Sequence, residues 1–241
     1  MIILNTIPDD SPVLIHSPLL RGAEAVFEYV EGNGSIGLTK SKAFKRDFVA
    51  WAVKRIDWPR YTEADLYAVN KVLNEFDVPP LELLHFLFLE LRLARHFKGE
   101  FRLTKAGRNL SCSRGKLFGV LTPFFLFHVD HSWTDRFGDR PFGTWEIWMN
   151  VINVEATRVV SGRELFEVFY GEHTGKDIDA VRAEGAFFTG VLRPLNWSGL
   201  LAQVESGSAG RWRDVHFVKT PLWHSALALD TDPEVASQPH H

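Results

Sequence analysis

Apolar residues recur at every third or fourth position over several stretches of the chain, a spacing that places them on one face of an α-helix. The first stretch runs from Pro18 to Val30, and Gly32-Asn33-Gly34 comes directly after it. Proline is favoured in the first turn of a helix, and glycine is favoured just past the last turn. The pattern therefore predicts a helix from Pro18 to about Gly32.

The same spacing predicts further helices in both halves of the chain. In the N-terminal half they cover residues 40–56, 62–76 and 80–91, and in the C-terminal half residues 118–129, 144–154, 161–171 and 177–192. The helix at 40–56 is rich in Lys and Arg, and Trp58-Pro59 stops it because proline restrains the residue before it. The helix at 80–91 is apolar nearly all round, which is typical of a helix buried on most sides.

Two stretches alternate apolar and polar residues around a turn, which is typical of a β-hairpin. The first comprises residues 93–97, the turn Lys98-Gly99 and residues 101–104; the second comprises residues 200–204, a polar turn at 205–210 and residues 212–220. Thr104 and Thr220 end these hairpins 116 residues apart. In a winged helix, helices are followed along the chain by a two-stranded β-hairpin, which is called the wing. We therefore predict a mainly α protein with short β-hairpin wings, built as two winged-helix-like units in tandem.

These elements imply a division of the chain into four parts. Residues 1–17 are rich in turn-forming residues and predict an extended N-terminal arm. Residues 18–112 form the first winged-helix-like unit, and residues 113–229 form a helical region with the second one. Residues 230–241 are expected to be a flexible tail, and a short helix is expected just before it, ending near Leu229.

The amino-acid composition mainly excludes other classes of protein. The 241 residues include 19 Phe, 8 Trp and one Cys, and their formal net charge is −3. So many large apolar side chains exclude a disordered chain, and the lone Cys112 excludes an intramolecular disulfide framework. No apolar run reaches the length of a membrane span, and residues 1–10 lack the pattern of a secretory signal. We therefore expect a cytoplasmic protein with no membrane association.

Several short motifs resemble a group of uncharacterised bacterial proteins, some of them plasmid-borne. They are Pro18-Leu19-Leu20, Ala23, Tyr29-Val30, Leu38-Thr39, the basic residues 40–46, the wing motif at residues 103–108 with Leu110, the Phe-rich helix and Asp-containing loop at 117–130, and Trp212 with Thr220. The resemblance spans roughly residues 18–229. It implies a wing in each half of the chain and supplies no activity. The two wings differ in one respect, because Gly107 of the first has Trp223 as its counterpart in the second.

Basic residues concentrate in the second predicted helix and on the first wing. They are Lys40, Lys42, Lys45, Arg46, Lys98, Arg102, Lys105 and Arg108. If they share a face, they are candidates for contacts with nucleic-acid phosphates. The alternative is the solvated face of an amphipathic helix, which the negative net charge favours. The helix at 80–91 offers no Arg, Lys, Asn or Gln to read base edges, so groove reading through it is disfavoured.

Candidates for other chemistry are few. His128, Asp130 and His131 have the residue types and spacing of metal ligands, but they fall where a helix meets a loop, where Asp and His commonly cap. Cys112 has no local signature of a nucleophile. No phosphate-binding or dinucleotide-binding glycine pattern follows a predicted strand, so we expect no cofactor.

The leading hypothesis is therefore a non-enzymatic interaction protein of winged-helix type. Its partner is a second copy of the chain or another macromolecule, and the abundant aromatic residues fit either a packed core or a partner surface. The alternative hypothesis is a DNA- or RNA-binding regulator that uses the basic helix and the wing. An enzyme assembled from residues distant in sequence is a third reading.

Overall fold

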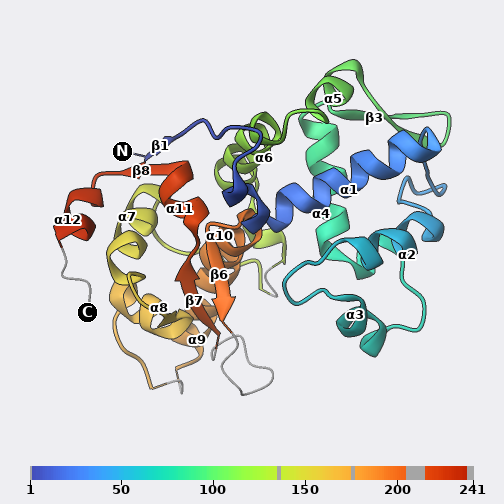
Figure 1. Cartoon of the computed structure of the whole chain (residues 1–241). Helices are drawn as coiled ribbons and strands as arrows, with labels where there is room; N and C mark the ends of the chain where they lie inside the picture. Colours follow the sequence, from blue (N-terminus) through green and yellow to red (C-terminus); the bar gives the residue numbers. More distant parts are fainter. Residues whose placement is uncertain (1, 135–136, 175–176, 205–214, 238–241) are drawn as a thin grey trace. The chain divides into compact units, whose positions relative to one another are not determined.

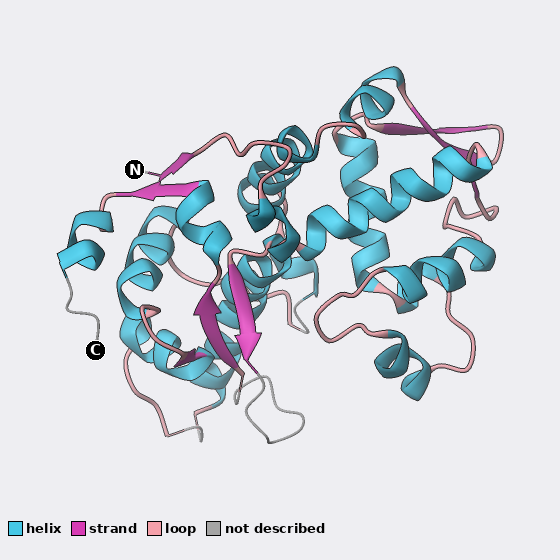
Figure 2. Cartoon of the chain, in the orientation of Figure 1, coloured by secondary structure: helices cyan, strands magenta, loops and turns pink. Residues whose placement is uncertain are grey.

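The computed structural model describes residues 2–134, 137–174, 177–204 and 215–237 (Figure 1). Helices make up most of this part of the chain, and its strands form small antiparallel sheets (Figure 2). The chain divides into two compact units. We call Ile7–Thr122 the N-terminal unit; the C-terminal unit comprises Pro123–His241 together with the first six residues.

The N-terminal unit places four helices before a β-hairpin and a fifth helix after it. Its elements are a 3-10 turn η1 (Pro12–His16), α1 (Pro18–Asn33), β2 (Ile36–Gly37), α2 (Arg46–Arg55), α3 (Glu63–Val69), a 3-10 turn η2 (Glu75–Asp77), α4 (Pro79–Glu90), β3 (Ala94–Phe97), β4 (Glu100–Leu103) and α5 (Lys105–Leu110). Strands pair in the order β2-β4-β3. Helix α6 (Arg114–His128) begins in this unit and ends in the other.

The C-terminal unit has a closely similar order of elements. It contains a 3-10 turn η3 (His131–Thr134), α7 (Trp145–Glu155), β5 (Val160–Ser161), α8 (Gly162–Tyr170), α9 (Ile178–Phe187), a π-helical stretch η4 (Phe188–Leu192), α10 (Arg193–Ser198), β6 (Leu201–Val204), β7 (His216–Lys219), α11 (Pro221–Ala226), β8 (Leu227–Leu229) and α12 (Asp232–Ser237). Its hairpin sheet has the order β5-β7-β6. Strand β1 (Ile2–Leu4) pairs with β8, which places the start of the chain in this unit.

The two hairpins share their register and their way of ending. Phe101 pairs with Ile36, and at the same place in the other sheet Phe217 pairs with Val160; both phenylalanines are fully buried. The strand after the turn ends in each case at a threonine whose hydroxyl accepts from a backbone N–H of the next helix. The sequence match between Thr104 and Thr220 therefore corresponds to a repeated local structure.

A glycine and a tryptophan three residues after these threonines make the two ends differ. A Cβ on Gly107 would lie 2.1 Å from the carbonyl oxygen of Leu93, so only glycine lets α5 approach the strand this closely. Trp223 occupies the same position of α11, where it is buried and donates its indole N–H to Asn153 at 2.9 Å. The difference noted between the two sequence motifs thus reflects two ways of packing the closing helix.

Several helix boundaries differ from the predicted ones. The basic helix expected at 40–56 begins only at Arg46, because Leu38 forms a β-bridge with Phe44 and Lys42 has a φ of +67°. The helix expected at 62–76 ends at Val69, and Asn74 and Asp77 form a separate capping box around η2. The helix expected at 118–129 begins at Arg114 and accommodates Pro123 in its interior. The helix expected to end at Leu192 continues, through a π-helical stretch, to Ser198.

Within the described residues, segments near both ends of the chain form defined contacts and elements. Within the expected arm, Leu14 is fully buried, and the carboxylate of Asp9 accepts from the backbone N–H of Gly115 at 2.8 Å. The expected short helix before the tail stops at Ala226, since residues 227–229 form the strand that pairs with β1. Asp232 starts a helix inside the expected flexible tail and accepts from Asn153 at 2.9 Å. The polar turn predicted at 205–210 lies outside the described residues.

Candidate functional site

The hairpin of the N-terminal unit has one buried face and one charged face. Ala94, Phe101 and Leu103 are buried, whereas the alternate residues Arg95, Phe97 and Arg102 are exposed. Successive side chains of a strand point to opposite faces, so these exposed residues share the outer face of the sheet. Arg95 pairs directly with Arg102, and Phe97 pairs with Glu100.

Three cations surround the ring of Phe97, whose residue is 40% exposed. The guanidinium carbons of Arg95 and Arg102 lie 5.4 and 5.5 Å from the ring centroid, and the amine of Lys98 lies 5.3 Å from it. Lys98 and Gly99 both have positive φ, as a tight two-residue hairpin turn requires. This turn holds Lys98 beside the ring at the tip of the hairpin.

The side chain of Lys45 extends the charged face across the third strand. A Cβ on Gly37 would lie 2.9 Å from the Lys45 Cδ, which shows that the lysine stem crosses this glycine. Gly37 pairs with Glu100, whose carboxylate also forms an ion pair with Arg102 at 2.5 Å. We call the resulting surface the basic sheet face; it comprises Lys45, Arg95, Phe97, Lys98, Glu100 and Arg102. Four of its side chains are cationic and one is anionic.

The structure separates the eight basic residues singled out in the sequence, although all eight are exposed. Lys45, Lys98 and Arg102 lie on the basic sheet face, and the charge of Lys42 acts on His96 of β3. Arg46 instead donates to Asn74 at 2.9 Å, and Arg108 donates to the carbonyl of Leu103 at 2.9 Å.

Lys40 lies in the loop before α2, and Lys105 lies in the first turn of α5. Sequence reasoning missed Arg95 and Phe97. The period of two along the predicted strand at 93–97 is the signal that would have placed both on one face.

A buried relay on the inner side of the sheet connects this hairpin to the basic loop before α2. Glu75 accepts from the backbone N–H of Phe44 and from His85 Nδ1, the latter at 2.5 Å. The other nitrogen of His85 lies 2.7 Å from His96 Nε2. Burial, then the neighbouring His85 and Lys42, lower the pKa of His96, while Glu75 opposes this shift. The relay therefore fixes the loop, α4 and β3 to one another.

Helix α4 exposes a narrow stripe that contrasts with the basic sheet face. Glu82, Phe86, Leu89 and Glu90 are its only residues that are not buried, apart from Pro79 in the first turn. Burial, together with the charges of Glu75 and Asp77, raises the pKa of Glu82. The stripe carries no Arg, Lys, Asn or Gln, so this helix lacks the side chains that read base edges.

The three candidate metal ligands that the sequence suggests lie in different surroundings. His128 is exposed and stacks on Phe124 with centroids 5.3 Å apart. Asp130 accepts from Ser132 at 2.7 Å and from Arg140, and these bonds, with Ser132 the larger cause, lower its pKa. Burial lowers the pKa of His131 to about 4, so this imidazole is neutral among Phe125 and Trp145. Across the described parts of the chain, no three His, Cys, Asp or Glu side chains are arranged to hold a metal ion.

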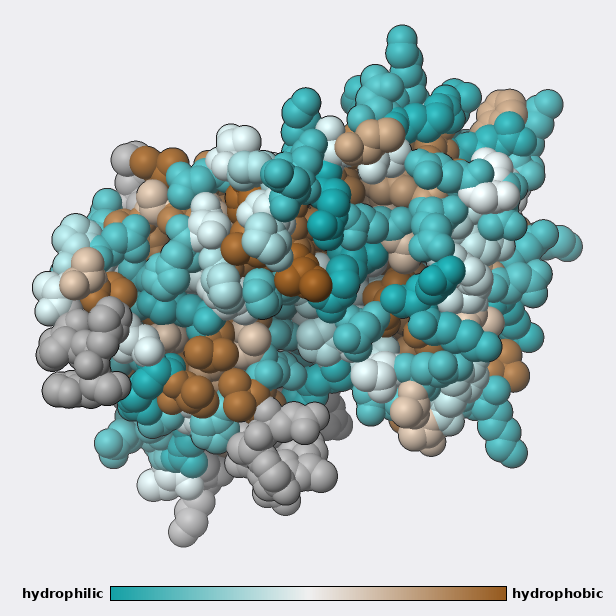
Figure 3. Space-filling view, viewed as in Figure 1, coloured by the Kyte–Doolittle hydropathy of each residue, from teal (hydrophilic) through white to brown (hydrophobic). Residues whose placement is uncertain are grey.

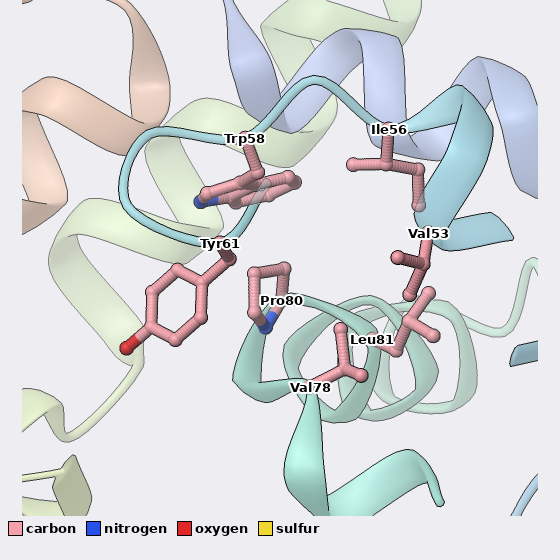
Figure 4. A pocket seen from close by; sticks show the side chains of 7 residues that line it. All are labelled: Val53, Ile56, Trp58, Tyr61, Val78, Pro80 and Leu81. Atoms are coloured by element: carbon pink, nitrogen blue, oxygen red, sulfur yellow. The ribbon is translucent and has the colours of Figure 1, made fainter. Parts of the chain in front are cut away.

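A shallow apolar pocket lies in the N-terminal unit (Figure 4). It is lined by Val53, Ile56, Trp58, Tyr61, Val78, Pro80 and Leu81. Its free space is about 10 Å³, about the room for one water molecule, which is far below the several hundred Å³ typical of ligand pockets. The lining offers little polar chemistry, so the pocket has no features of an active site. The single cysteine, Cys112, is exposed.

Among the described residues, the corresponding sheet face of the C-terminal unit has no arginine at the positions of Arg95 and Arg102. Ala202 and Val218 pair where Arg95 and Arg102 pair, and Val204 and His216 pair where Phe97 and Glu100 pair. Lys219 faces inward instead and donates to the backbone carbonyl of Asn153 at 2.6 Å.

Figure 3 shows hydrophilic residues over most of the visible face of both units, with hydrophobic residues gathered in small areas. No helix in the ranges described combines the length and apolar character needed to cross a membrane.

Comparison with known proteins agrees with the division into two consecutive domains. Residues 15–116 match the family model of the Y4jL N-terminal domain, and residues 135–221 match that of the y4jL C-terminal domain. The "Uncharacterized protein y4jL" of Sinorhizobium fredii (strain NBRC 101917 / NGR234) is 36% identical over 162 residues, which cover 67% of this chain and 74% of that protein. No solved structure matches the chain. The matches to both domain models and this level of identity show that the chain belongs to the bacterial y4jL family.

Proposed function

We propose that the N-terminal unit is a winged helix that binds the phosphate backbone of nucleic acid through its basic sheet face. The proposal is supported by the strand order β2-β4-β3 and by the element order α1-β2-α2-α3-α4-β3-β4, which resembles that of a winged helix with one additional helix before the wing formed by β3 and β4. The observation that carries the proposal is the cluster of Lys45, Arg95, Lys98 and Arg102 on one exposed sheet face. Clustered cations on one face are the electrostatic footprint of phosphate binding.

The composition of α4 indicates whether the N-terminal unit contacts the bases or the phosphate backbone of nucleic acid. In a groove-reading winged helix, the helix before the wing supplies side chains that bond to base edges. Here Phe86 and Glu90 of that helix are exposed and Glu82 and Leu89 are half-buried, and carboxylates repel the phosphates beside a groove. The wing therefore supplies the nucleic-acid contact, and binding depends on backbone charge more than on sequence.

The experiment measures binding of labelled 20-nucleotide DNA, single-stranded and duplex, by fluorescence anisotropy at several salt concentrations. The double variant Arg95→Gln/Arg102→Gln should lose about tenfold in affinity, and the slope of log affinity against log salt should fall by about 1.5 because two phosphate contacts are lost. The matched control is Lys54→Gln/Lys71→Gln, which removes two exposed lysines of the same unit that lie outside the sheet. No binding by the parent protein in low salt, or equal losses in both variants, would overturn the proposal.

A protein partner is the second candidate function, and a different surface favours it. Phe76 on η2 is 65% exposed and Phe86 on α4 is 44% exposed, and these two elements pack against each other. Exposed phenylalanines on packed elements are typical of association surfaces. Sedimentation equilibrium over a hundredfold concentration range tests the case of self-association. A mass that rises with concentration, and that returns to the monomer value in Phe76→Ser/Phe86→Ser, supports it; a constant monomer mass contradicts it.

A further inference from the structure

The setting of Phe97 identifies the form of nucleic acid that suits the basic sheet face. Phe97 is exposed at the end of β3, and two guanidinium groups and one amine lie over its ring at 5.3 to 5.5 Å from the centroid. A base that stacks on this ring takes the place of one of these mobile cations, whose charge then meets the phosphates of the same strand. Binding of the phosphates alone requires only the cationic side chains. An aromatic ring among them adds a flat apolar surface, and such a surface binds the face of an unpaired base.

We infer that the basic sheet face binds a single strand, an inference that rests on the proposed function. Phe97 stacks on an unpaired base of this strand. Arg95, Lys98 and Arg102 pair with the phosphates around that base. The shared chemistry is an unpaired base on a phosphate backbone, which either RNA or single-stranded DNA supplies. Arginine guanidinium planes also stack on bases, so Arg95 and Arg102 fit both roles.

The surroundings of the face argue against a duplex as the preferred ligand. In a duplex the base faces are covered by their neighbours, so Phe97 gains no stacking partner unless base pairs are opened. Helix α4 ends at Glu90, just before β3 begins at Ala94, and it exposes carboxylates rather than base-reading groups.

The C-terminal unit provides an internal reference for this inference. The position that corresponds to Phe97 holds Val204, and the positions of Arg95 and Arg102 hold Ala202 and Val218. Within residues 201–204 and 216–219, the described part of the second hairpin, the register of the first hairpin is kept, and these three positions hold neither an aromatic ring nor a cation. We therefore expect the single-strand site on the sheet face of the first hairpin.

The test compares four labelled 12-mers at one salt concentration: oligo-dT, oligo-dA, oligo-U and a DNA duplex of mixed sequence. The parent protein should bind at least one single strand about tenfold more tightly than the duplex. Phe97→Leu removes the aromatic ring and keeps an apolar side chain of similar size, and it should lower single-strand affinity about tenfold. Phe97→Trp should preserve that affinity, and Val204→Leu should leave it unchanged.

The salt dependence separates the failure of this inference from the failure of the proposed function. Phe97→Leu should keep the salt slope of the parent protein, because no phosphate contact is removed. Duplex binding equal to or tighter than single-strand binding, with no effect of Phe97→Leu, would overturn the inference while backbone binding stands. If none of the four oligonucleotides binds in low salt, both proposals fail. Preference for oligo-U or for the DNA strands supports the inference and identifies the source of the strand.

Discussion

The N- and C-terminal units build nearly the same arrangement of helices and strands and then use its outer sheet face differently. Phe101 and Phe217 occupy equivalent buried positions, and Thr104 and Thr220 close the two hairpins in the same way. On the opposite face, Arg95 and Arg102 stand where the second unit has Ala202 and Val218. Inward positions must fill a core, whereas outward positions are free to vary. The shared features therefore report on the fold, and the differing outward residues are the place where the surfaces of the two units can serve different roles.

Each unit also buries a Glu–His pair, with the two partners exchanged. In the N-terminal unit the histidine, His85, is on α4 and the glutamate, Glu75, is on the preceding turn, 2.5 Å away. In the C-terminal unit the glutamate, Glu184, is on α9 and the histidine, His173, is in the preceding loop, 3.3 Å away. Both pairs link the long helix to the segment before it. Both units therefore link a helix to the preceding segment through a Glu–His pair, but the glutamate and the histidine exchange places.

The largest effect we predict concerns the residue three positions after each closing threonine. Trp223→Ala should lower the free energy of unfolding by about 4 kcal/mol, because it leaves a large cavity and removes the hydrogen bond to Asn153. Gly107→Ala should cost about 3 kcal/mol, because a Cβ 2.1 Å from a backbone oxygen forces α5 away from the strand. Hydrogen exchange followed by mass spectrometry on the whole chain measures both. Each variant should lose protection mainly in its own unit, and equal losses in both units would contradict the division.

Acid should affect the C-terminal unit more than the N-terminal one. The pKa of His131 is about 4 in the folded protein and near 6.5 in an unfolded chain, so unfolding takes up a proton between these values. The free energy of unfolding should therefore be highest above pH 6.5 and fall by about 3 kcal/mol on going to pH 4. Hydrogen exchange of peptides from α7 and α10 follows this loss. His131→Phe should remove most of it, and the exposed His128→Phe serves as the control; an unchanged acid profile in His131→Phe would refute the assignment.

The smallest predicted difference lies between the two closing threonines. Thr220 is buried, and its hydroxyl donates to the carbonyl of Gly199 at 2.6 Å and accepts from the N–H of Leu222. Thr104 makes similar bonds but is only half-buried, so water replaces its hydroxyl more readily. Thr220→Val should therefore cost about 2 kcal/mol and Thr104→Val about 1 kcal/mol, measured by urea unfolding. A larger cost for Thr104→Val would show that burial is not what distinguishes them.

Local sequence patterns predicted most helices and both hairpins because they depend on neighbouring residues. The capping box of Ser161 with Glu164, the Lys98-Gly99 turn and the proline at the start of α1 each act within four residues. The predicted boundaries failed where a distant partner decides them. Residues 40–45 leave the helix because Leu38 and Phe44 bridge beside the sheet and Glu75 accepts from Phe44. Asp232 lies at the start of a helix and accepts from Asn153, 79 residues earlier in the chain.

The candidate site was predicted only in part for the same reason. Lys45, Lys98 and Arg102 were identified as basic residues, but the sequence could not decide which cations share a face. That depends on the pairing of β3 with β4 and of β2 with β4, which assigns Arg95 and Phe97 to the outer face and turns Lys45 across Gly37. Arg46, close in sequence, binds Asn74 instead.

By itself, the sequence determined a mainly helical chain with two hairpins that repeat at a distance of 116 residues, because helical spacing, caps and turns are local properties. Its composition also disfavoured base reading by α4, since that helix has no Arg, Lys, Asn or Gln. Only the tertiary structure decided which charges act together, how the ends of the chain pair through β1 and β8, and which hairpin carries the basic sheet face. These depend on contacts between residues far apart in the chain, where strand register and burial, rather than local preference, fix the direction of each side chain.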